Sequence, residues 1–376
     1  MHGVSGWIFL IFSIESSDSC ESHNAFRLQE GNMKIGLIEG NGIGPEITKA
    51  MKEVLDATGL GIEWVPVFIG DEAMEKTGHP LPQDSIRLLR ELKVAIKGPF
   101  IVEKFKGSLR CVHEDGSDHV YPSLNNAIRR ELELFVCPRP IRGVPGLSGR
   151  HETMDVTVMR EITEDVYFGV EHAIGDCAAE CVKLTTRAAV TRVTEFSFEY
   201  ARKYGHGRVS CVHKANALSV TDGLFLKCFR EVATRYPDIR SDDCMVDAAA
   251  FYLAKNPDAF DIIVTANQYG DILSDLCAGL AGSMGLAPGG NIGMDCAVFE
   301  ASHGAAPDIA GKGIANPTAL ILSGAFMLRH LGLDKEAARV EKAARAVLME
   351  RETLTPDLGG KAGTMEFTKA VIKKMR

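Results

Sequence analysis

The sequence predicts an α/β protein, and three observations support that prediction. Short runs rich in Ile and Val alternate with amphipathic helical patterns along the 376 residues, as in a mostly parallel sheet covered by helices. A glycine-rich turn joins the first of these runs to the first helical pattern. The composition is globular, with 45% hydrophobic and 24% charged residues, and the length suffices for two domains or one large interleaved domain.

The elements follow one another along the chain in a regular way. The first strand is predicted at residues 34–38 and the first helix at 47–60, with Pro45 at a position that the first turn of a helix tolerates. Further strands are predicted at 62–69, 94–97, 134–138, 155–160, 208–213, 261–266 and 297–300, where β-branched residues cluster. Further helices are predicted at 124–132, 188–204, 222–236, 245–255, 319–331 and 334–349.

The glycine-rich turn at residues 39–44, EGNGIG, allows two interpretations. Glycines between a strand and a helix can cradle a pyrophosphate at the helix N-terminus, as in a Rossmann fold. The spacing here is Gly-x-Gly-x-Gly rather than Gly-x-Gly-x-x-Gly, and Asp71, the acid after the second strand, lies further along than usual. The motif therefore favours a tight turn that borders a differently built nucleotide site.

Two carboxylates, Asp271 and Asp275, lie four residues apart where an Ile/Val strand gives way to an amphipathic helix. They share one helix face, although this spacing alone also fits a solvated surface. A third acid, Asp247, precedes an apolar helix. The chain has a net charge of −8, yet five arginines gather in one short region: Arg129, Arg130, Arg139, Arg142 and Arg160. Carboxylates for a hard divalent cation beside arginines for an anion predict metal-assisted chemistry on a polycarboxylate.

Composition also excludes several classes of protein. No apolar run reaches the roughly 18 residues that a membrane span needs, so no membrane association is expected. The pI of about 5.8 and the absence of a Lys/Arg-rich block argue against nucleic acid as a partner. The ten cysteines include no Cys-x-x-Cys pair, which indicates neither a zinc ribbon nor a disulfide framework. A reducing, cytoplasmic location is therefore expected.

Residues 1–32 differ from the rest of the chain. An apolar run at 7–14 is followed by a polar run at 15–22. The segment lacks the basic start of a secretory signal and the arginines of a mitochondrial transit peptide. We therefore expect a disordered tail or a start placed too far upstream, with the fold beginning at Met33.

Seven motifs occur in order at residues 40–46 (GNGIGPE), 97–99 (KGP), 123–129 (SLNNAIR), 160–167 (REITEDVY), 213–216 (HKAN), 270–275 (GDILSD) and 303–308 (HGAAPD). From about Met33 to the C-terminus the chain thus resembles the isocitrate and isopropylmalate dehydrogenase family, most closely its NAD-dependent isocitrate dehydrogenases. Asn41 stands where aspartate is commoner, Ile162 where Asn is usual and Ala215 where many members have Gly. None of these departures removes a group that performs chemistry. Ile162, however, cannot hydrogen-bond Arg160 through its side chain as the usual Asn could, so the sequence does not show what holds Arg160 in place.

The resemblance implies a particular architecture. A large interleaved domain would comprise residues 33–134 and 282–376, and a smaller domain 135–281 would contain a dimer clasp near 165–186. The implied assembly is a homodimer with shared active sites, possibly within a higher oligomer. Lys214 and Asp247 would reach into the active site of the neighbouring subunit.

The resemblance also assigns substrate, metal and catalytic roles. Ser123 and Asn125 would contact the γ-carboxylate of the substrate, and Arg129, Arg139 and Arg160 its other carboxylates. The residues themselves agree with this, since Ser123 can cap a helix whose N-terminal end favours anions. Mg²⁺ or Mn²⁺ would be held by Asp247, Asp271 and Asp275 and would stabilise an alkoxide and then an enolate. Lys214 and Tyr167 resemble the base and the acid of the family.

For the cofactor, the resemblance points to the loop at 303–317. The implied contacts are Asn216 at the nicotinamide end, Asn316 near the adenine, and Glu300, His303, Gly304, Asp308 and Ile309. A carboxylate at Asp308 can accept hydrogen bonds from a ribose 2′-hydroxyl but would repel a 2′-phosphate. Members that use NADP have Lys-Tyr at the Asp308-Ile309 pair, so NAD is predicted.

The expected reaction converts isocitrate and NAD to 2-oxoglutarate, carbon dioxide and NADH. Isopropylmalate, homoisocitrate and tartrate are alternative substrates, although no leucine-rich helix for an isopropyl group is evident. A regulatory subunit of a heteromeric enzyme is a further alternative, which the presence of Tyr167, Lys214 and the three aspartates disfavours. The insertion at residues 100–121 has no predicted role.

Overall fold

The structure is a computed structural model that describes residues 33–101, 109–112, 116–147 and 149–376. The tail expected at 1–32 lies outside these residues. From residue 32 to the C-terminus the chain is one compact unit, and the division of that unit into a large and a small domain stays a prediction.

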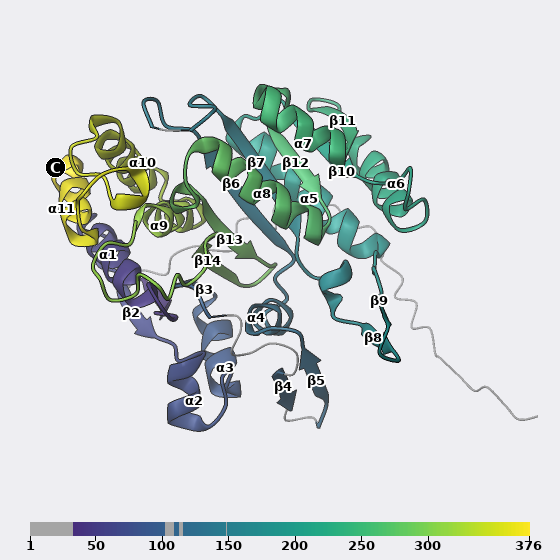
Figure 1. Ribbon diagram of the computed structural model, residues 1–376, viewed down its shortest axis with the longest axis horizontal. Helices are drawn as coiled ribbons and strands as arrows, with labels where there is room; N and C mark the ends of the chain where they lie inside the picture. The colour runs from purple at the N-terminus through teal and green to yellow at the C-terminus, as the bar shows by residue number, and fades with distance from the viewer. Residues whose placement is uncertain (1–32, 102–108, 113–115, 148) are drawn as a thin grey trace, which may run out of the picture. The chain divides into compact units, whose positions relative to one another are not determined.

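A sheet of ten strands runs through this unit in the order β11-β10-β12-β7-β6-β13-β14-β3-β1-β2 (Figure 1). Neighbouring strands are parallel except at the centre, where β13 is antiparallel to β14 and β6, and β6 is antiparallel to β7. The strands are β1 (Lys34–Ile38), β2 (Glu63–Pro66), β3 (Val94–Lys97), β6 (Val136–Arg142), β7 (Asp155–Glu161), β10 (Arg208–His213), β11 (Arg240–Met245), β12 (Ile262–Thr265), β13 (Pro288–Ile292) and β14 (Ala297–Ala301). The α/β prediction is confirmed.

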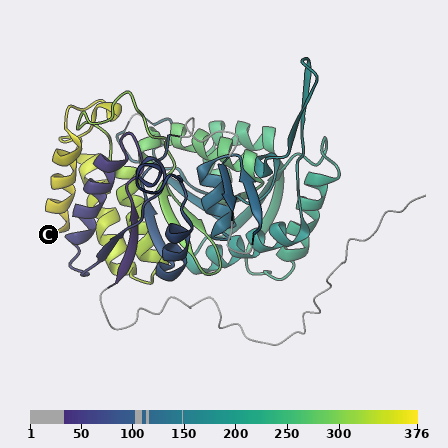
Figure 2. The ribbon, with the colours of Figure 1, turned by 90° about the horizontal axis from the view of Figure 1, so that it is seen from below.

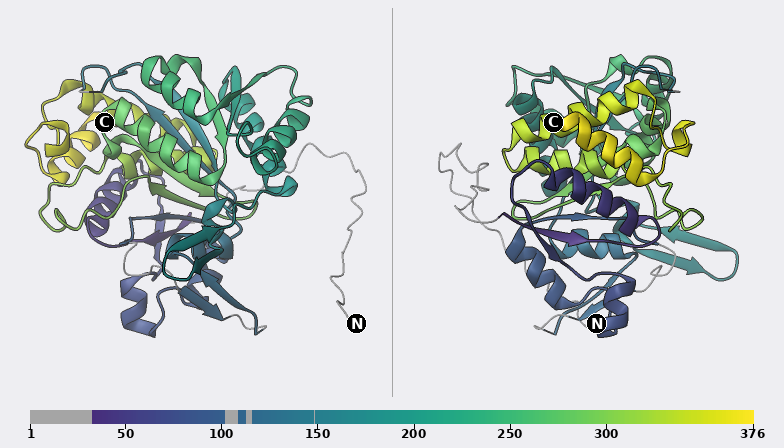
Figure 3. Two further views of the ribbon diagram at one scale, coloured as in Figure 1. Left: turned by 45° about the vertical axis from the view of Figure 1, so that its right-hand side comes forward. Right: turned by 90° about the vertical axis from the view of Figure 1, so that its left-hand side faces the viewer.

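Helices cover both faces of the sheet (Figures 1 and 3). The α-helices are α1 (Gly44–Asp56), α2 (Asp71–Thr77), α3 (Gln83–Leu92), α4 (Leu124–Glu131), α5 (Arg187–Tyr204), α6 (Thr221–Ala233), α7 (Val246–Lys255), α8 (Asn267–Ala281), α9 (Thr318–His330), α10 (Asp334–Glu350) and α11 (Thr364–Met375). Single 3₁₀ turns are η2 (Val166–Phe168), η3 (Pro257–Ala259), η4 (Met284–Leu286) and η5 (Pro356–Leu358). The helix pairs α5–α6 and α7–α8 flank the strands from β11 to β6, whereas α1, α9, α10 and α11 pack together beside β13 and β14.

Two antiparallel hairpins stand outside the large sheet. One pairs β4 (Leu109–Val112) with β5 (Asp118–Tyr121), inside the insertion noted at 100–121. The other pairs β8 (Glu171–Ile174) with β9 (Ala178–Cys181), and every residue of its two strands is exposed. Figure 2 shows this second hairpin extending away from the sheet. It lies within the predicted clasp region, and its role in a dimer stays a prediction.

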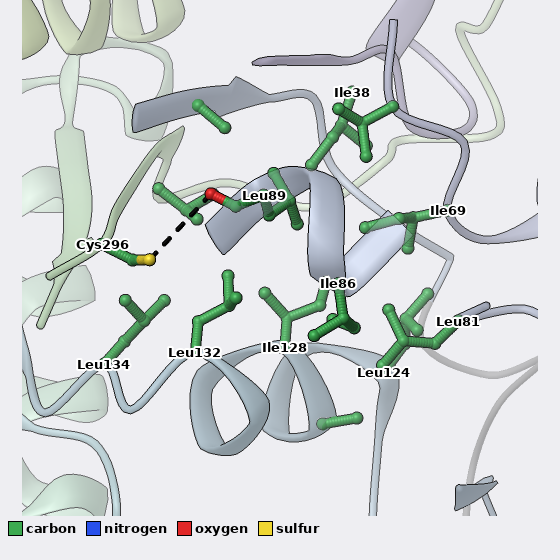
Figure 4. Packing of buried hydrophobic residues seen from close by; sticks show 14 of the residues in the cluster. Ile38, Ile69, Leu81, Ile86, Leu89, Leu124, Ile128, Leu132, Leu134 and Cys296 are labelled. Atoms are coloured by element: carbon green, nitrogen blue, oxygen red, sulfur yellow. Dashed lines mark hydrogen bonds between the residues drawn. The ribbon is translucent and has the colours of Figure 1, made fainter. Parts of the chain in front are cut away.

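Helix α4 is fixed in place by an apolar core that it shares with α3 (Figure 4). Leu124 and Ile128 are four residues apart and point to the same face of α4, where Ile86 and Leu89 of α3 meet them. All four side chains are at most 2% exposed. The Ser123 hydroxyl accepts a hydrogen bond from the Asn126 amide at 3.2 Å and caps the helix.

Some elements escaped the sequence prediction, for physical reasons. The edge strand β11 has the sequence RSDDCM and no buried residue, so it carries no hydrophobic periodicity. The buried strand β13 contains Gly290, where a Cβ would lie 2.8 Å from the ring of Phe299. Close packing against Phe299 thus requires glycine at position 290, and glycine has a low propensity for strands, so the strand was not recognised. The short helices α2 and α3 and the terminal helix α11 were not predicted either.

Candidate active site

The candidate site lies at the carboxyl edge of three parallel strands, β7, β10 and β12. Their register aligns Arg160 and Val212 with Thr265 of β12. Helix α8 begins directly after β12, and the Lys214 loop begins directly after β10. Because the carboxyl ends of parallel strands meet at one edge, Arg160, Lys214 and the start of α8 converge there.

Two buried guanidinium groups face helix α8. Arg160 donates from Nε to the backbone and side-chain oxygens of Asn267 at 3.0 and 2.9 Å, and its Nη1 pairs with Asp271. Arg139 donates from Nη1 to Ser274 Oγ at 2.5 Å and lies 3.5 Å from Oδ1 of both Asp271 and Asp275. The side chains of Arg160 and Arg139 are only 3% and 7% exposed. Isolating such charges from water is costly unless they are paired.

A third arginine adds positive charge to this cluster. Arg129 of α4 donates from Nε to Asn291 Oδ1 at 3.0 Å and lies 3.7 Å from Glu300 Oε1. Burial, together with the charges of Arg139 and Arg129, lowers the pKa of Arg160 to about 10. The three guanidinium groups therefore repel one another, and an anion bound between them would relieve that repulsion.

The start of α4 provides polar groups next to Arg129. Asn125 has a buried Oδ1 atom with no hydrogen-bond partner among the described residues, and a buried unpaired amide oxygen is unfavourable. The Asn125 oxygen can thus accept a hydrogen bond from a donor of a ligand, and the Ser123 hydroxyl, which accepts the capping hydrogen bond, keeps a proton to donate.

The structure brings together two of the three predicted metal ligands. Asp271 and Asp275 share one face of α8. Burial and the charge of Asp271 raise the pKa of Asp275, although the charge of Arg139 acts in the opposite direction. Like charges at this spacing, with oxygen ligands, fit a hard divalent cation. In the described part of the single chain, no three acidic, His or Cys side chains come close enough to hold a metal. Asp247 is paired instead with Lys214, whose Nζ lies 2.8 Å from its Oδ1.

Tyr167 lies beside the carboxylates, whereas Lys214 does not contact them. The Tyr167 hydroxyl donates to Asp271 Oδ2 at 3.4 Å, and the Arg160 guanidinium lies 5.7 Å from the centre of its ring. Burial and the charge of Asp271 raise the pKa of Tyr167, which keeps the phenol protonated. Lys214 pairs with Asp247 instead, and the expectation that both residues reach into the active site of a neighbouring subunit stays a prediction.

A half-buried lysine, Lys183, links the Lys214 loop to helix α8, and the sequence analysis missed it. Lys183 Nζ lies 2.8 Å from Asp165 Oδ1 and 3.2 Å from Asp222 Oδ1. The second oxygen of Asp165 accepts from the Gln268 amide at 2.8 Å, and that of Asp222 accepts from the Lys214 amide at 2.7 Å. These residues lie far apart in sequence and form no periodic pattern. The only signal was that Asp165 belongs to the motif containing Tyr167.

The glycine-rich turn after β1 packs against other loops. The Asn41 amide donates to the Pro99 carbonyl at 2.7 Å, and the Ile43 amide donates to the Ala305 carbonyl at 2.9 Å. A Cβ on Gly42, whose φ is +60°, would lie 2.0 Å from the Ala305 oxygen. The backbone amides of Asn41 and Ile43, which could otherwise bind a phosphate, therefore already donate hydrogen bonds within the protein. The motif therefore forms a tight turn that packs against the loop at 303–317, and the nucleotide site that it is expected to border stays a prediction.

The loop at 303–317 is held from the α1 side. Glu46, at the start of α1, accepts hydrogen bonds from the Gly313 amide at 3.2 Å and the Ala315 amide at 2.9 Å. The Asn316 side chain donates to Asp357 Oδ2 at 2.9 Å and accepts from the Thr318 amide at 3.0 Å. Its side chain thus serves the loop itself, and its expected place near the adenine stays a prediction.

The other predicted cofactor residues differ in their surroundings. Asp308, Gly304 and Asn216 are exposed, and Ile309 is half-buried. His303 Nδ1 lies 3.0 Å from the Gly304 carbonyl oxygen, whereas its Nε2 is buried without a hydrogen-bond partner among the described residues. Such an orphaned nitrogen fits a site for a polar ligand. Glu300 instead lies inside the protein, where its carboxylate pairs with Lys97 and accepts from Asn291 Nδ2 at 2.6 Å.

The fold and the site define an α/β enzyme with a buried anion-binding cluster beside paired carboxylates. The family model described as isocitrate/isopropylmalate dehydrogenase matches residues 34–371. The chain belongs to the isocitrate/isopropylmalate dehydrogenase family and is an oxidoreductase of that family.

Individual relatives support this assignment. The chain is 45% identical to the mitochondrial NAD isocitrate dehydrogenase catalytic subunit 5 of Arabidopsis thaliana, over 89% of this chain and 86% of that protein. It is 44% identical to the chloroplastic 3-isopropylmalate dehydrogenase of Solanum tuberosum, over 82% and 83%. The crystal structure of isocitrate dehydrogenase from Methylococcus capsulatus superposes with a TM-score of 0.83 at 41% identity, covering 91% of this chain and 99% of that one.

These relatives contradict the expectation of a cytoplasmic protein. The Arabidopsis relative is named as mitochondrial. The inference failed because scattered free cysteines indicate a reducing compartment but do not distinguish one reducing compartment from another. Within the described residues, no helix has both the length and the apolar character needed to cross a membrane.

Glu300 gives the site a testable pH dependence of folding stability. Burial alone would raise the pKa of Glu300, but Lys97, Arg129 and Asn291 lower it from 4.5 to about 2. Because the pKa is lower in the folded state, the carboxylate stabilises the fold above about pH 4.5, and this contribution is lost as the pH falls towards about 2. The contribution is on the order of 3 kcal/mol.

We therefore predict that Glu300→Gln lowers the free energy of unfolding, and that its difference from wild type shrinks between about pH 5 and pH 3. Urea titrations across this range measure the difference. The exposed Glu352, replaced by Gln, serves as the control and is expected to change stability little. A Glu300→Gln difference that stays constant with pH would contradict the assignment.

Proposed function

We propose that the protein catalyses the oxidative decarboxylation of isocitrate to 2-oxoglutarate and carbon dioxide, with NAD as the oxidant. The observation that carries this proposal is the convergence of Arg129, Arg139 and Arg160 beside the carboxylates of α8. Three guanidinium groups suit a substrate with several carboxylates, since arginine binds carboxylates with paired hydrogen bonds. The relatives named as isocitrate dehydrogenases support the same reaction.

Asp271 and Asp275 fit Mg²⁺ or Mn²⁺, with Asp247 of a second copy as the third ligand. This division explains why Asp247 and Lys214 pair with each other, away from α8 of their own chain. The active site would then be complete only in a dimer, for which the exposed β8–β9 hairpin is the proposed clasp. The bound cation would supply Lewis-acid polarisation of the substrate hydroxyl oxygen.

The remaining residues bind the substrate and move protons. Arg129, Arg139 and Arg160 orient its carboxylates, and Ser123 and Asn125 receive the γ-carboxylate. Lys214 of the second copy accepts the proton of the substrate hydroxyl, while the carbon that bears this hydroxyl transfers a hydride to the nicotinamide ring. Loss of carbon dioxide leaves an enolate, and Tyr167, whose raised pKa keeps it protonated, donates a proton to the enolate carbon.

The first test is a substrate panel with the purified single chain, NAD and Mn²⁺. We expect kcat/KM for isocitrate to exceed that for 3-isopropylmalate, homoisocitrate and tartrate by at least about tenfold, or 1.4 kcal/mol. The reason is that the Ser123 hydroxyl keeps a proton to donate, which favours a charged γ-carboxylate over an apolar group.

The competing functions give different results in this panel. A preference for 3-isopropylmalate would replace the proposed substrate but keep the reaction type. A chain that is inactive alone and activates a separate catalytic subunit would be a regulatory subunit, and the proposal would then be wrong. Tyr167→Phe serves as the inactive control for contaminating dehydrogenases.

The coenzyme prediction depends on the exposed Asp308. Its carboxylate is expected to accept hydrogen bonds from the adenosine ribose of NAD and to repel the 2′-phosphate of NADP. We predict that wild type prefers NAD by at least about a hundredfold in kcat/KM, roughly 2.7 kcal/mol. The double variant Asp308→Lys, Ile309→Tyr should lose efficiency with NAD and gain it with NADP. A wild type that uses both coenzymes equally would contradict the role of Asp308.

A further inference from the structure

Two of the five arginines lie outside the anion-binding cluster: Arg142, which pairs with Asp155, and Arg130. It follows Arg129 on α4, and its guanidinium carbon lies 5.2 Å from the ring centre of Tyr121 and 4.9 Å from that of Phe168. Both distances fall within the range of a cation–π interaction. Tyr121 ends the β4–β5 hairpin, and Phe168 directly follows Tyr167 in η2. Arg130 thus connects the inserted hairpin to the turn that carries the proposed proton donor.

The Tyr121 side of this contact is rigid. Tyr121 is 2% exposed, and its hydroxyl donates to Glu131 Oε1 at 2.6 Å. The Nδ1 atom of His119 lies 3.1 Å from the same hydroxyl. Burial and the neighbouring Glu131 carboxylate raise the pKa of Tyr121, so the phenol remains a hydrogen-bond donor. The ring therefore offers Arg130 a fixed surface.

A second contact joins the same two segments independently of Arg130. A Cβ on Gly169 would lie 3.1 Å from Pro122 Cγ and 3.2 Å from Pro122 Cδ. Gly169 also has a φ of +87°, a conformation that favours glycine. The corner between β5 and α4 therefore packs directly on the turn at residues 167–169.

These contacts determine how α4 and Tyr167 are placed. The apolar face of α4, with Leu124 and Ile128, is held by the core shared with α3 (Figure 4). Ser123 and Asn125, the proposed γ-carboxylate contacts, therefore occupy fixed positions. Tyr167 lies on a single 3₁₀ turn, which has little internal support of its own. Its placement relative to α4 depends on the neighbours of Phe168 and Gly169.

We propose that Arg130 is a positioning residue, which holds the Phe168 turn against the β5–α4 corner and so sets the position of the Tyr167 hydroxyl relative to the bound substrate. This inference rests on the proposed function, because it requires Tyr167 to act on a substrate held by Ser123 and Asn125. It also gives a role to the hairpin inserted at residues 100–121, which supplies the Tyr121 ring. A displacement of about 1 Å at a reacting group can lower a rate by about a hundredfold.

The test compares Arg130→Ala, Arg130→Lys and Phe168→Ala with wild type in steady-state assays. Arg130→Ala and Phe168→Ala should each lower kcat at least about tenfold, or 1.4 kcal/mol, while the KM values for isocitrate and NAD change less than about threefold. The kcat of the double variant should be about equal to that of the slower single variant, because each substitution alone already removes the contact between Arg130 and Phe168. Arg130→Lys keeps the charge but not the planar group, so its kcat should lie between wild type and Arg130→Ala.

A matched control comes from the same chain. Arg202 lies over the Tyr236 ring at 4.9 Å, far from α4 in sequence and outside the proposed site, so Arg202→Ala should leave kcat unchanged. Thermal unfolding of every variant identifies loss of folded protein, and kcat is expressed per folded enzyme. If Arg130→Ala does not fold, the kcat values of Arg130→Lys and Phe168→Ala provide the test.

The outcomes separate the two proposals. If wild type does not turn over isocitrate, the proposed function is wrong, and the same comparison is made with the family substrate that wild type accepts. If wild type is active and folded Arg130→Ala keeps the wild-type kcat, the positioning role is wrong. If Arg130→Ala does not fold, an unchanged kcat in Phe168→Ala leads to the same conclusion. A lower melting temperature with unchanged kcat would show a structural role alone and would also overturn the inference.

Discussion

The site depends on the pairing of two buried guanidinium groups with one helix. Arg160 and Arg139 come from the antiparallel neighbours β7 and β6, and both point at α8, where Asp271, Asp275 and Ser274 receive them. Removing a charge from water costs several kcal/mol unless partners compensate, so the positions of both strands relative to α8 are constrained. Arg129 adds a third charge that α8 does not neutralise. The same pairing that constrains these strands therefore also gathers three guanidinium groups where the substrate is proposed to bind.

The buried ionic contacts extend this constraint to the edges of the site. Lys183 connects Asp165, which accepts from the start of α8, with Asp222, which accepts from the Lys214 amide. On the other side, Glu46 and the Gly42 turn hold the loop from Ala305 to Asn316. Arg130 and Gly169 place the Tyr167 turn against α4. The start of α8, the Lys214 loop, the loop from Ala305 to Asn316 and the Tyr167 turn are thus each held by hydrogen-bonded or closely packed residues.

The sequence predicted those features that leave a local signal. The α/β fold followed from the alternation of Ile/Val runs with amphipathic helical patterns, and the spacing of Asp271 and Asp275 and the cap of α4 by Ser123 are likewise local. The bridge made by Lys183 could not be predicted, since it joins three segments through single side chains. The strand β11 was missed because an exposed edge strand needs no apolar periodicity. The glycine turn at 40–44 shows that one glycine pattern can serve close packing as well as phosphate binding, a choice that only the contacts of Asn41 and Ile43 reveal.

The central claim is that the arginine cluster and the α8 carboxylates together bind a metal-chelated polycarboxylate. A crystal structure of the protein with Mn²⁺ and isocitrate, with the metal located by its anomalous signal, tests this claim most directly. We predict one Mn²⁺ at about 2.1 Å from carboxylate oxygens of Asp271 and Asp275, with Asp247 of a second copy as the third ligand and the substrate carboxylates against Arg129, Arg139 and Arg160. An anomalous peak away from α8, or isocitrate bound without contact to these arginines, would contradict it.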